Sequence, residues 1–154
     1  MQLELLARGA ASTVNLELSS GYEPDAARLI AEAGVSGRVT RVLGVDLARE
    51  PGKVEPSDVV LLHRVVCCYP DHAGLLGAAA DHARRAIVFS HPPRTLLSRA
   101  MVAASNLMLR LRGRTYRGFV HDPEAMVAVL RRHGFEPRYR HRGLVWSIVG
   151  ATRT

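Results

Sequence analysis

Lysine is almost absent from this chain: Lys53 is the only one among 21 basic residues, and the others are arginines. Against 14 acidic residues this gives a formal net charge of +7 at pH 7. An arginine-rich solvated surface accounts for the excess, and an anionic partner is the alternative. The arginines are spread along the sequence, most densely from Arg110 to Arg117, and no nucleic-acid-binding motif accompanies them. We therefore expect no nucleic-acid partner.

Cysteine is scarce as well, and the two present, Cys67 and Cys68, are adjacent. Sequence neighbours rarely reach the geometry of a disulfide, and neither a second cysteine pair nor a spaced histidine cluster completes a zinc site. We interpret both as small, buried, apolar side chains. The pattern predicts a reduced, cytoplasmic protein without a metal site.

Long apolar runs are also missing. A helix that spans a bilayer needs roughly 18 apolar residues, and the most apolar stretch, Leu96 to Leu111, is interrupted by serine, asparagine and arginine. The segment Met1 to Glu4 has no basic region ahead of an apolar one, so we expect no signal peptide. With 47% hydrophobic residues in 154, we expect one globular domain over residues 1–154, with no integral membrane segment.

Strand and helix patterns alternate along the chain. Helical spacing and capping residues predict helices over residues 2–8, 23–33 and 95–111, after Asp71, and after Asp122-Pro123. Alternating or continuous apolar runs predict strands over residues 13–18, 39–43, 58–66, 86–89, 137–142 and 144–149. Only Gly143 separates the last two, which predicts an antiparallel hairpin. The order as a whole predicts an α/β fold with three layers around a mostly parallel sheet.

Open α/β sheets bind ligands at the carboxyl ends of their strands. The segments to inspect are therefore 17–21, 44–47, 63–70 and 90–93.

Four features of the chain resemble class I S-adenosylmethionine-dependent methyltransferases. They are the order of these elements, Glu17 at a strand end, the segment Asp58 to Pro70, and Leu96-Leu97-Ser98-Arg99. Within that family the likeness is to the magnesium-protoporphyrin O-methyltransferase type and its bacterial relatives. It covers nearly the whole chain and implies a Rossmann-like fold. It also implies methyl transfer to a small-molecule acceptor, small or hydrophobic, and leaves the acceptor unidentified.

The resemblance implies roles for two acidic positions. Glu17, followed by Leu18, matches the family's acid that accepts hydrogen bonds from the cofactor ribose, a task for which a carboxylate has two oxygens. Asp46, followed by Leu47, matches the acid that meets the adenine amino group, although here Val45 separates it from Gly44. For Glu17 the alternative is a solvated carboxylate at a strand end.

Four side chains are candidates to bind or activate the acceptor. His63, at the end of the strand from Asp58, is expected to act as a general base or to pack under the cofactor. Arg64 beside it would contact the cofactor, an acidic acceptor or another carboxylate. Tyr69 lines the acceptor pocket or anchors the fold, and His91 would face the acceptor. Methyl transfer needs alignment above all, so few catalytic side chains are required.

The family's first motif, a buried strand running into a glycine-rich loop, has no counterpart here. Met1 to Leu6 resembles the helix that follows that loop. We expect that a longer parent protein exists and that binding of S-adenosylmethionine is weakened or lost. We also expect the two strands beside the gap to pair with each other, to associate as a homo-oligomer, or to fold poorly.

Two other functions stay open. One is a non-catalytic Rossmann-like binding or interaction module that has lost the cofactor site, which the missing loop favours. The other is a nicotinamide-dependent enzyme, which the final hairpin fits less well.

Overall fold

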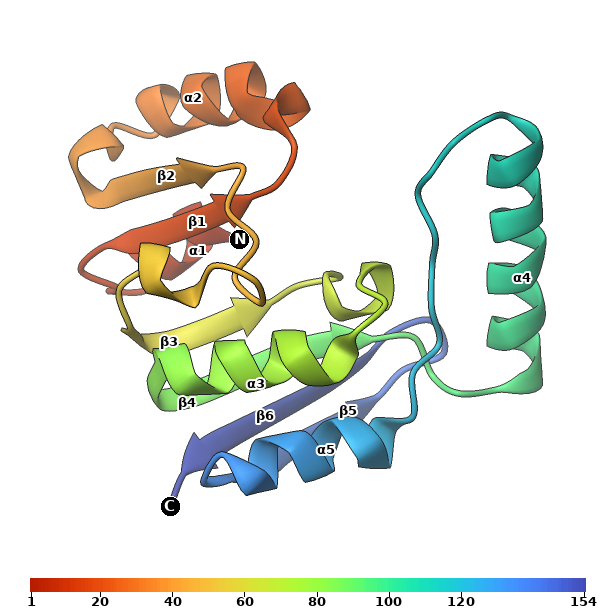
Figure 1. Ribbon diagram of the computed structural model, residues 1–154. Helices are drawn as coiled ribbons and strands as arrows, with labels where there is room; N and C mark the ends of the chain where they lie inside the picture. Colours follow the sequence, from red (N-terminus) through yellow and green to blue (C-terminus); the bar gives the residue numbers. More distant parts are fainter. The chain divides into compact units, whose positions relative to one another are not determined.

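The computed structural model describes residues 1–154 and divides into two compact units, Met1–Lys53 and Val54–Thr154 (Figure 1). No helix in the structure combines the length and the apolar composition needed to cross a membrane.

The first unit is built on a pair of parallel strands. Its elements are α1 (Gln2–Ala7), β1 (Thr13–Glu17), α2 (Glu23–Glu32) and β2 (Val39–Leu43), with single 3₁₀ turns at Ser20–Tyr22, Ser36–Arg38 and Pro51–Lys53. Thr13 lies opposite Val39 and Glu17 opposite Leu43. Because parallel neighbours need a crossover, α2 connects the two strands. The Arg41 guanidinium bonds to Glu23 and Asn15 and so ties β2 to α2 and β1.

The second unit holds a four-stranded mixed sheet. Its elements are β3 (Ser57–Leu62), α3 (His72–His82), β4 (Ala83–His91), α4 (Leu96–Leu111), α5 (Pro123–Arg132), β5 (Phe135–Arg142) and β6 (Ser147–Arg153), with a 3₁₀ turn at Val66–Cys68. The strand order is β3-β4-β6-β5. β3 and β4 are parallel, and β6 runs antiparallel to both of its neighbours.

The core of the second unit lies between this sheet and the helices α3 and α5, which cover one face (Figure 1). Phe89 from β4, Phe135 from β5 and Leu130 from α5 are fully buried there. Small residues let α3 approach the sheet closely, since Ala79 and Ala80 are also fully buried. Truncating either phenylalanine to alanine should cost about 3–5 kcal/mol of unfolding free energy.

Several predictions from the sequence are confirmed. The α/β class, the parallel β3–β4 pair and the final antiparallel hairpin are all present. Asp71 caps α3 by accepting from the Gly74 amide at 2.9 Å, and Asp122 caps α5 by accepting from the Glu124 amide at 3.0 Å. Both carboxylates satisfy amides that a helix leaves without a partner in its first turn.

Other boundaries were wrong. The predicted strand 58–66 ends at Leu62, because Arg64 adopts φ 56° and a 3₁₀ turn follows it. The strand expected from Leu144 begins at Ser147, because residues 143–146 form the hairpin loop and Leu144 is 98% exposed. An apolar run alone does not separate a strand from an exposed loop tip.

The single sheet expected from the sequence is also wrong: the strands form two sheets. β1 pairs only with β2, and β3 pairs only with β4. Of the three expected outcomes for the strands beside the gap, direct pairing of β1 with β3 is not formed. One edge of β1 and one edge of β3 consequently carry backbone groups that no strand of this chain satisfies.

Candidate functional site

In the first unit, the end of β1 presents a carboxylate. Glu17 is half-buried, and its Oε1 accepts a hydrogen bond from the Ser19 amide at 3.1 Å. Its second oxygen has no partner in the protein. The next residue, Leu18, is exposed. This end of β1 therefore offers an oriented acceptor oxygen beside an apolar side chain.

The segment after β2 lies next to the end of β1 in the same unit. Gly44, at φ 72°, turns the chain out of β2, and its amide donates to the Glu17 carbonyl at 2.9 Å. Asp46 Oδ1 accepts from the Ala48 amide at 3.0 Å, and Arg49 Nε lies 3.6 Å from Oδ2. Asp46 thus shapes its own loop. Leu47 is buried.

In the second unit, Arg64 joins the ends of three strands. Its amide donates to the buried Ser90 hydroxyl at the end of β4, at 2.8 Å. Its guanidinium lies 4.8 Å from the centroid of the Trp146 ring, just before β6. Arg64 is the only non-glycine residue with positive φ, a conformation that surrounding contacts must hold. His63, beside it at the end of β3, is exposed.

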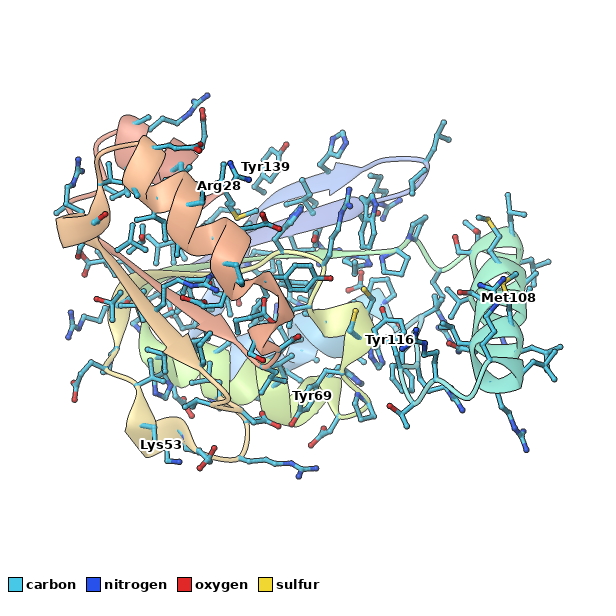
Figure 2. All side chains as sticks on the ribbon, turned by 90° about the horizontal axis from the view of Figure 1, so that it is seen from above. Arg28, Lys53, Tyr69, Met108, Tyr116 and Tyr139 are labelled. Carbon is cyan, nitrogen blue, oxygen red and sulfur yellow. The ribbon has the colours of Figure 1, made fainter.

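The two cysteines follow in the 3₁₀ turn. The Cys68 thiol donates to the Arg64 carbonyl at 3.3 Å, and its sulfur lies 2.9 Å from the Tyr116 hydroxyl (Figure 2). Burial, together with the neighbouring Cys68, raises the pKa of the Cys67 thiol to about 12. The hydrogen bond to Cys68, and then burial, raise the pKa of Tyr116. These groups stay protonated at neutral pH. The cysteines are half-buried rather than buried. Both thiols donate to the Arg64 carbonyl and so fasten the turn.

Tyr69 ends this turn and is held through its main chain. His121 Nε2 lies 3.0 Å from the Tyr69 carbonyl, and the His121 ring is 4.4 Å from that of His72. Burial, and then the nearby His121, lower the pKa of His72. Tyr69 is half-buried, at the edge where β3 and β4 end.

His91 lies apart from the Arg64–Ser90 contact. It follows Ser90 in β4, and successive strand residues point to opposite faces. Its Nδ1 lies 2.9 Å from the Pro92 carbonyl, and burial lowers its pKa. It lines a groove of about 400 Å³ together with two ion pairs, Arg94–Asp122 at 2.7 Å and Arg140–Glu124 at 2.8 Å.

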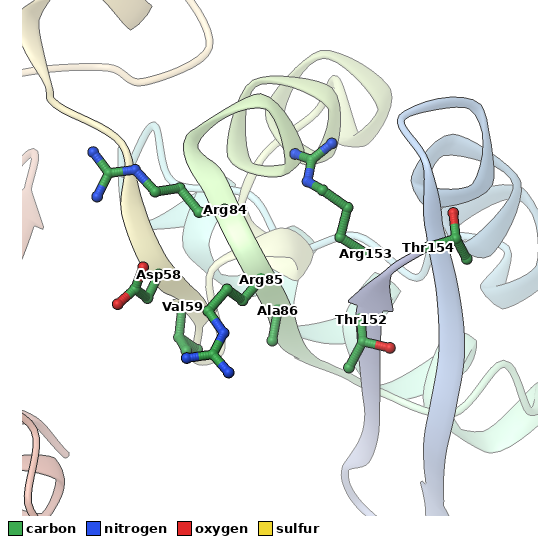
Figure 3. Close-up of a pocket in the computed structure, with 8 residues that line it drawn as sticks. All are labelled: Asp58, Val59, Arg84, Arg85, Ala86, Thr152, Arg153 and Thr154. Carbon is green, nitrogen blue, oxygen red and sulfur yellow. The ribbon is translucent and has the colours of Figure 1, made fainter.

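A larger hollow, of about 640 Å³, lies at the other end of the second unit's strands (Figure 3). Asp58 and Val59 of β3, Arg84 to Ala86 of β4 and the segment Thr152 to Thr154 line it. These positions are at the amino ends of β3 and β4. Ligands of α/β sheets bind at the carboxyl ends, so this hollow is separate from the site expected from the sequence.

The structure places His63, Arg64 and Tyr69 on the segment between β3 and α3. It places Glu17, Leu18, Asp46 and Leu47 at one end of the β1–β2 pair. Sequence reasoning did not single out Ser90, Trp146 or Tyr116. Ser90 fell within an inspected segment, but its partner could not be read without the β3–β4 register. Trp146 lies in a loop whose position depends on the β4–β6 pairing.

No protein-family model matches the chain, and no curated protein sequence does. Solved structures do. Magnesium protoporphyrin IX methyltransferase from Synechocystis, with bound SAH, superposes with a TM-score of 0.78 at 19% identity, over 99% of this chain and 68% of that one. Its form with bound SAM gives 0.71 at 19% identity, over 97% and 63%.

An O-methyltransferase family 2 protein from Planctomyces limnophilus, in complex with apigenin, gives a TM-score of 0.74 at 15% identity, over 99% of this chain and 46% of that one. The chain therefore spans about two thirds of the first enzyme's length and less than half of the second's. At these identities the likeness establishes the fold, which is that of S-adenosylmethionine-dependent methyltransferases.

Proposed function

We propose that residues 1–154 serve methyl transfer from S-adenosylmethionine to a small or hydrophobic acceptor, as a Rossmann-like three-layer domain. The observation that carries this proposal is the superposition of 99% of the chain, at a TM-score of 0.78, on a methyltransferase with bound SAH. The acceptor carboxylates of Glu17, at the end of β1, and of Asp46, after β2, support it. When bound, S-adenosylmethionine supplies an electrophilic methyl group on a sulfonium.

The residues of the first unit fit the nucleoside part of that cofactor. Glu17 has one oxygen held by the Ser19 amide and one without a protein partner, so it can accept from a ribose hydroxyl. Leu18 adds exposed apolar surface beside it. The Asp46 carboxylate would accept a hydrogen bond from the adenine amino group. Its Oδ2 lies 3.6 Å from Arg49 Nε, and the Arg49 side chain is 82% exposed. Leu47 would contribute through its main chain.

The residues of the second unit fit the acceptor chemistry. His63 is exposed at the end of β3 and would take the proton of an acceptor hydroxyl. The Arg64 guanidinium would bind a carboxylate of the cofactor or of an acidic acceptor. Tyr69 would line the acceptor pocket.

His91 is the second histidine available for proton transfer. Its lowered pKa keeps the imidazole neutral at neutral pH. With Nδ1 donating to the Pro92 carbonyl, Nε2 is the nitrogen left to accept a proton.

The cofactor affinity of this chain should be weak. Glycine-rich loops let the backbone approach a ligand closely, and no such loop follows a strand ahead of Glu17. The contacts that such a loop makes to the methionine part of the cofactor are therefore missing from residues 1–154.

Isothermal titration calorimetry with S-adenosylhomocysteine tests the proposal. We expect weak saturable binding that falls roughly 10- to 100-fold in Glu17→Gln, because one charged hydrogen bond contributes about 1.5–3 kcal/mol. Glu55→Gln is the matched control, since Glu55 is exposed and has no ion pair. Absence of saturable heat at high protein concentration would reject cofactor binding by this chain.

That result would favour a second function, a non-catalytic binding or interaction module. The observation behind this alternative is the division of the strands into two sheets, which leaves one edge each of β1 and β3 unpaired. Unpaired strand edges recruit other chains readily.

A further inference from the structure

Helix α4 carries an exposed apolar face. Six large side chains on it are between 52% and 83% exposed, and no residue of the helix is buried. They are Leu96, Leu97, Met101, Leu107, Met108 and Leu111. At helical spacing they form one continuous strip with Ala100 and Ala104, wider than the roughly 100° stripe of an ordinary amphipathic helix.

The opposite side of α4 is already occupied. Val102, Asn106 and Leu109 are half-buried. The Asn106 side chain donates to the Gly118 carbonyl at 2.9 Å and accepts from the Gly118 amide at 2.8 Å. These bonds fix the rotation of the helix against the returning segment, with its apolar face outward. Within its unit α4 stands away from the sheet, and Met108 lies on it (Figures 1 and 2).

The charges around this face are all of one sign. Residues 92–121 contain six arginines and no aspartate or glutamate. Arg94 pairs with Asp122, and Arg117 bonds to the carbonyls of Arg114 and Tyr116. The remaining four have no carboxylate partner: Arg99, Arg110, Arg112 and Arg114. By helical spacing Arg99 and Arg110 flank the apolar strip on one side.

We propose that α4 docks this protein on an anionic lipid bilayer, lying in the plane of the surface with its apolar strip among the acyl chains. An apolar face flanked by arginines is the arrangement that binds anionic lipid interfaces. At 16 residues the helix is about 24 Å long, which suits an interfacial position rather than a span. A second copy fits poorly, because Arg99 and Arg110 beside the strip would meet arginines of the other copy, and residues 92–121 hold no carboxylate to pair with them. The proposal does not depend on methyl transfer.

Vesicle co-sedimentation of the whole chain tests it. We expect about 10-fold stronger partitioning to phosphatidylcholine vesicles with about 30% phosphatidylglycerol than to pure phosphatidylcholine. Raising the ionic strength from about 0.05 M to about 0.5 M should weaken binding roughly 10-fold, because the Debye length shortens. Neither measurement requires cofactor or activity.

Paired variants test the apolar strip and the flanking arginines separately. Leu97→Gln with Met108→Gln should reduce partitioning at least about 10-fold, since both side chains would lie among acyl chains. Ser105→Gln places the same amide on α4 outside the strip and should leave binding within about twofold.

A second set of variants tests the two arginines beside the strip, again with a matched control. Arg99→Gln with Arg110→Gln should reduce partitioning about 10-fold. Arg132→Gln with Arg138→Gln removes equal charge from exposed positions on α5 and β5, and should have little effect. Helix content by circular dichroism should be unchanged in all four.

Three results would overturn the proposal: equal or absent binding to both vesicle types, equal losses in control and α4 variants, or a lipid-free dimer that Leu97→Gln with Met108→Gln dissociates. The last would assign the strip to self-association.

Discussion

The main-chain amide of Arg64 donates a 2.8 Å hydrogen bond to the buried hydroxyl of Ser90. This contact links the end of β3 to the end of β4 and holds Arg64 in its positive-φ conformation. It fixes the start of the turn that carries Tyr69. The candidate acceptor residues of the second unit therefore depend on one buried hydroxyl.

Removing that hydroxyl should destabilise the protein. Ser90→Ala leaves the Arg64 amide without its partner, and we expect a loss of about 1–3 kcal/mol in the free energy of unfolding. Ser105→Ala, at an exposed position of α4, should leave it within about 0.5 kcal/mol. Urea denaturation measures both. Equal effects would mean that the hydroxyl does not hold the turn.

Cys67 should react slowly with alkylating agents. Its pKa of about 12, raised from 9.0 by burial and by Cys68, leaves little thiolate at pH 8. The rate with iodoacetamide should be roughly 1000-fold below that of an unperturbed thiol. Peptide mapping by mass spectrometry identifies the modified residue, and unfolding in urea should restore the ordinary rate. Fast modification of Cys67 in the folded protein would contradict the burial of its thiol.

Stability should fall on mild acidification. Burial lowers the pKa of His91 below the ordinary value of 6.5, so the folded state binds this proton less readily than the unfolded state. The stabilisation is present above pH 6.5 and is lost as the pH falls from there through the folded-state pKa. Urea titrations between pH 8 and pH 5 should show the loss, and NMR titration should show the His91 ring protonating below free histidine. A pKa at or above 6.5 would remove the argument for a neutral His91.

The open edge of β3 should promote association. Val59 is 49% exposed on this strand, and a charged side chain at an unpaired edge opposes edge-to-edge pairing. Val59→Lys should slow concentration-dependent light scattering several-fold. Leu144→Lys adds the same charge at the hairpin loop and should slow it less. Equal slowing by both would point to net charge rather than the edge.

Much of the fold could be predicted from local sequence patterns. Val39–Leu43 was predicted to the residue, and the caps Asp71 and Asp122 do what their side chains suggested. These features depend on neighbours in the chain. The separation into two sheets, and the end of β3 at Leu62, depend on long-range pairing and on one backbone angle at Arg64, which apolar periodicity does not encode.

The positions of the candidate site residues could be predicted from the sequence better than the contacts of their side chains. Glu17 ends β1, His63 directly follows β3 and Asp46 lies in the loop after β2, and ligands of open α/β sheets bind at these carboxyl ends. The engagement of Asp46 with the Ala48 amide and the placement of His91 in the groove with Asp122 could not be predicted. Both follow from loop geometry and tertiary packing.

The most direct test of cofactor binding at the strand ends is an NMR titration of amide resonances with S-adenosylhomocysteine. We predict saturable shifts at Leu18, Ser19, Leu47 and Arg64. Shifts concentrated at Arg84 and Arg85, in the hollow of Figure 3, or no saturable shifts at all, would contradict it.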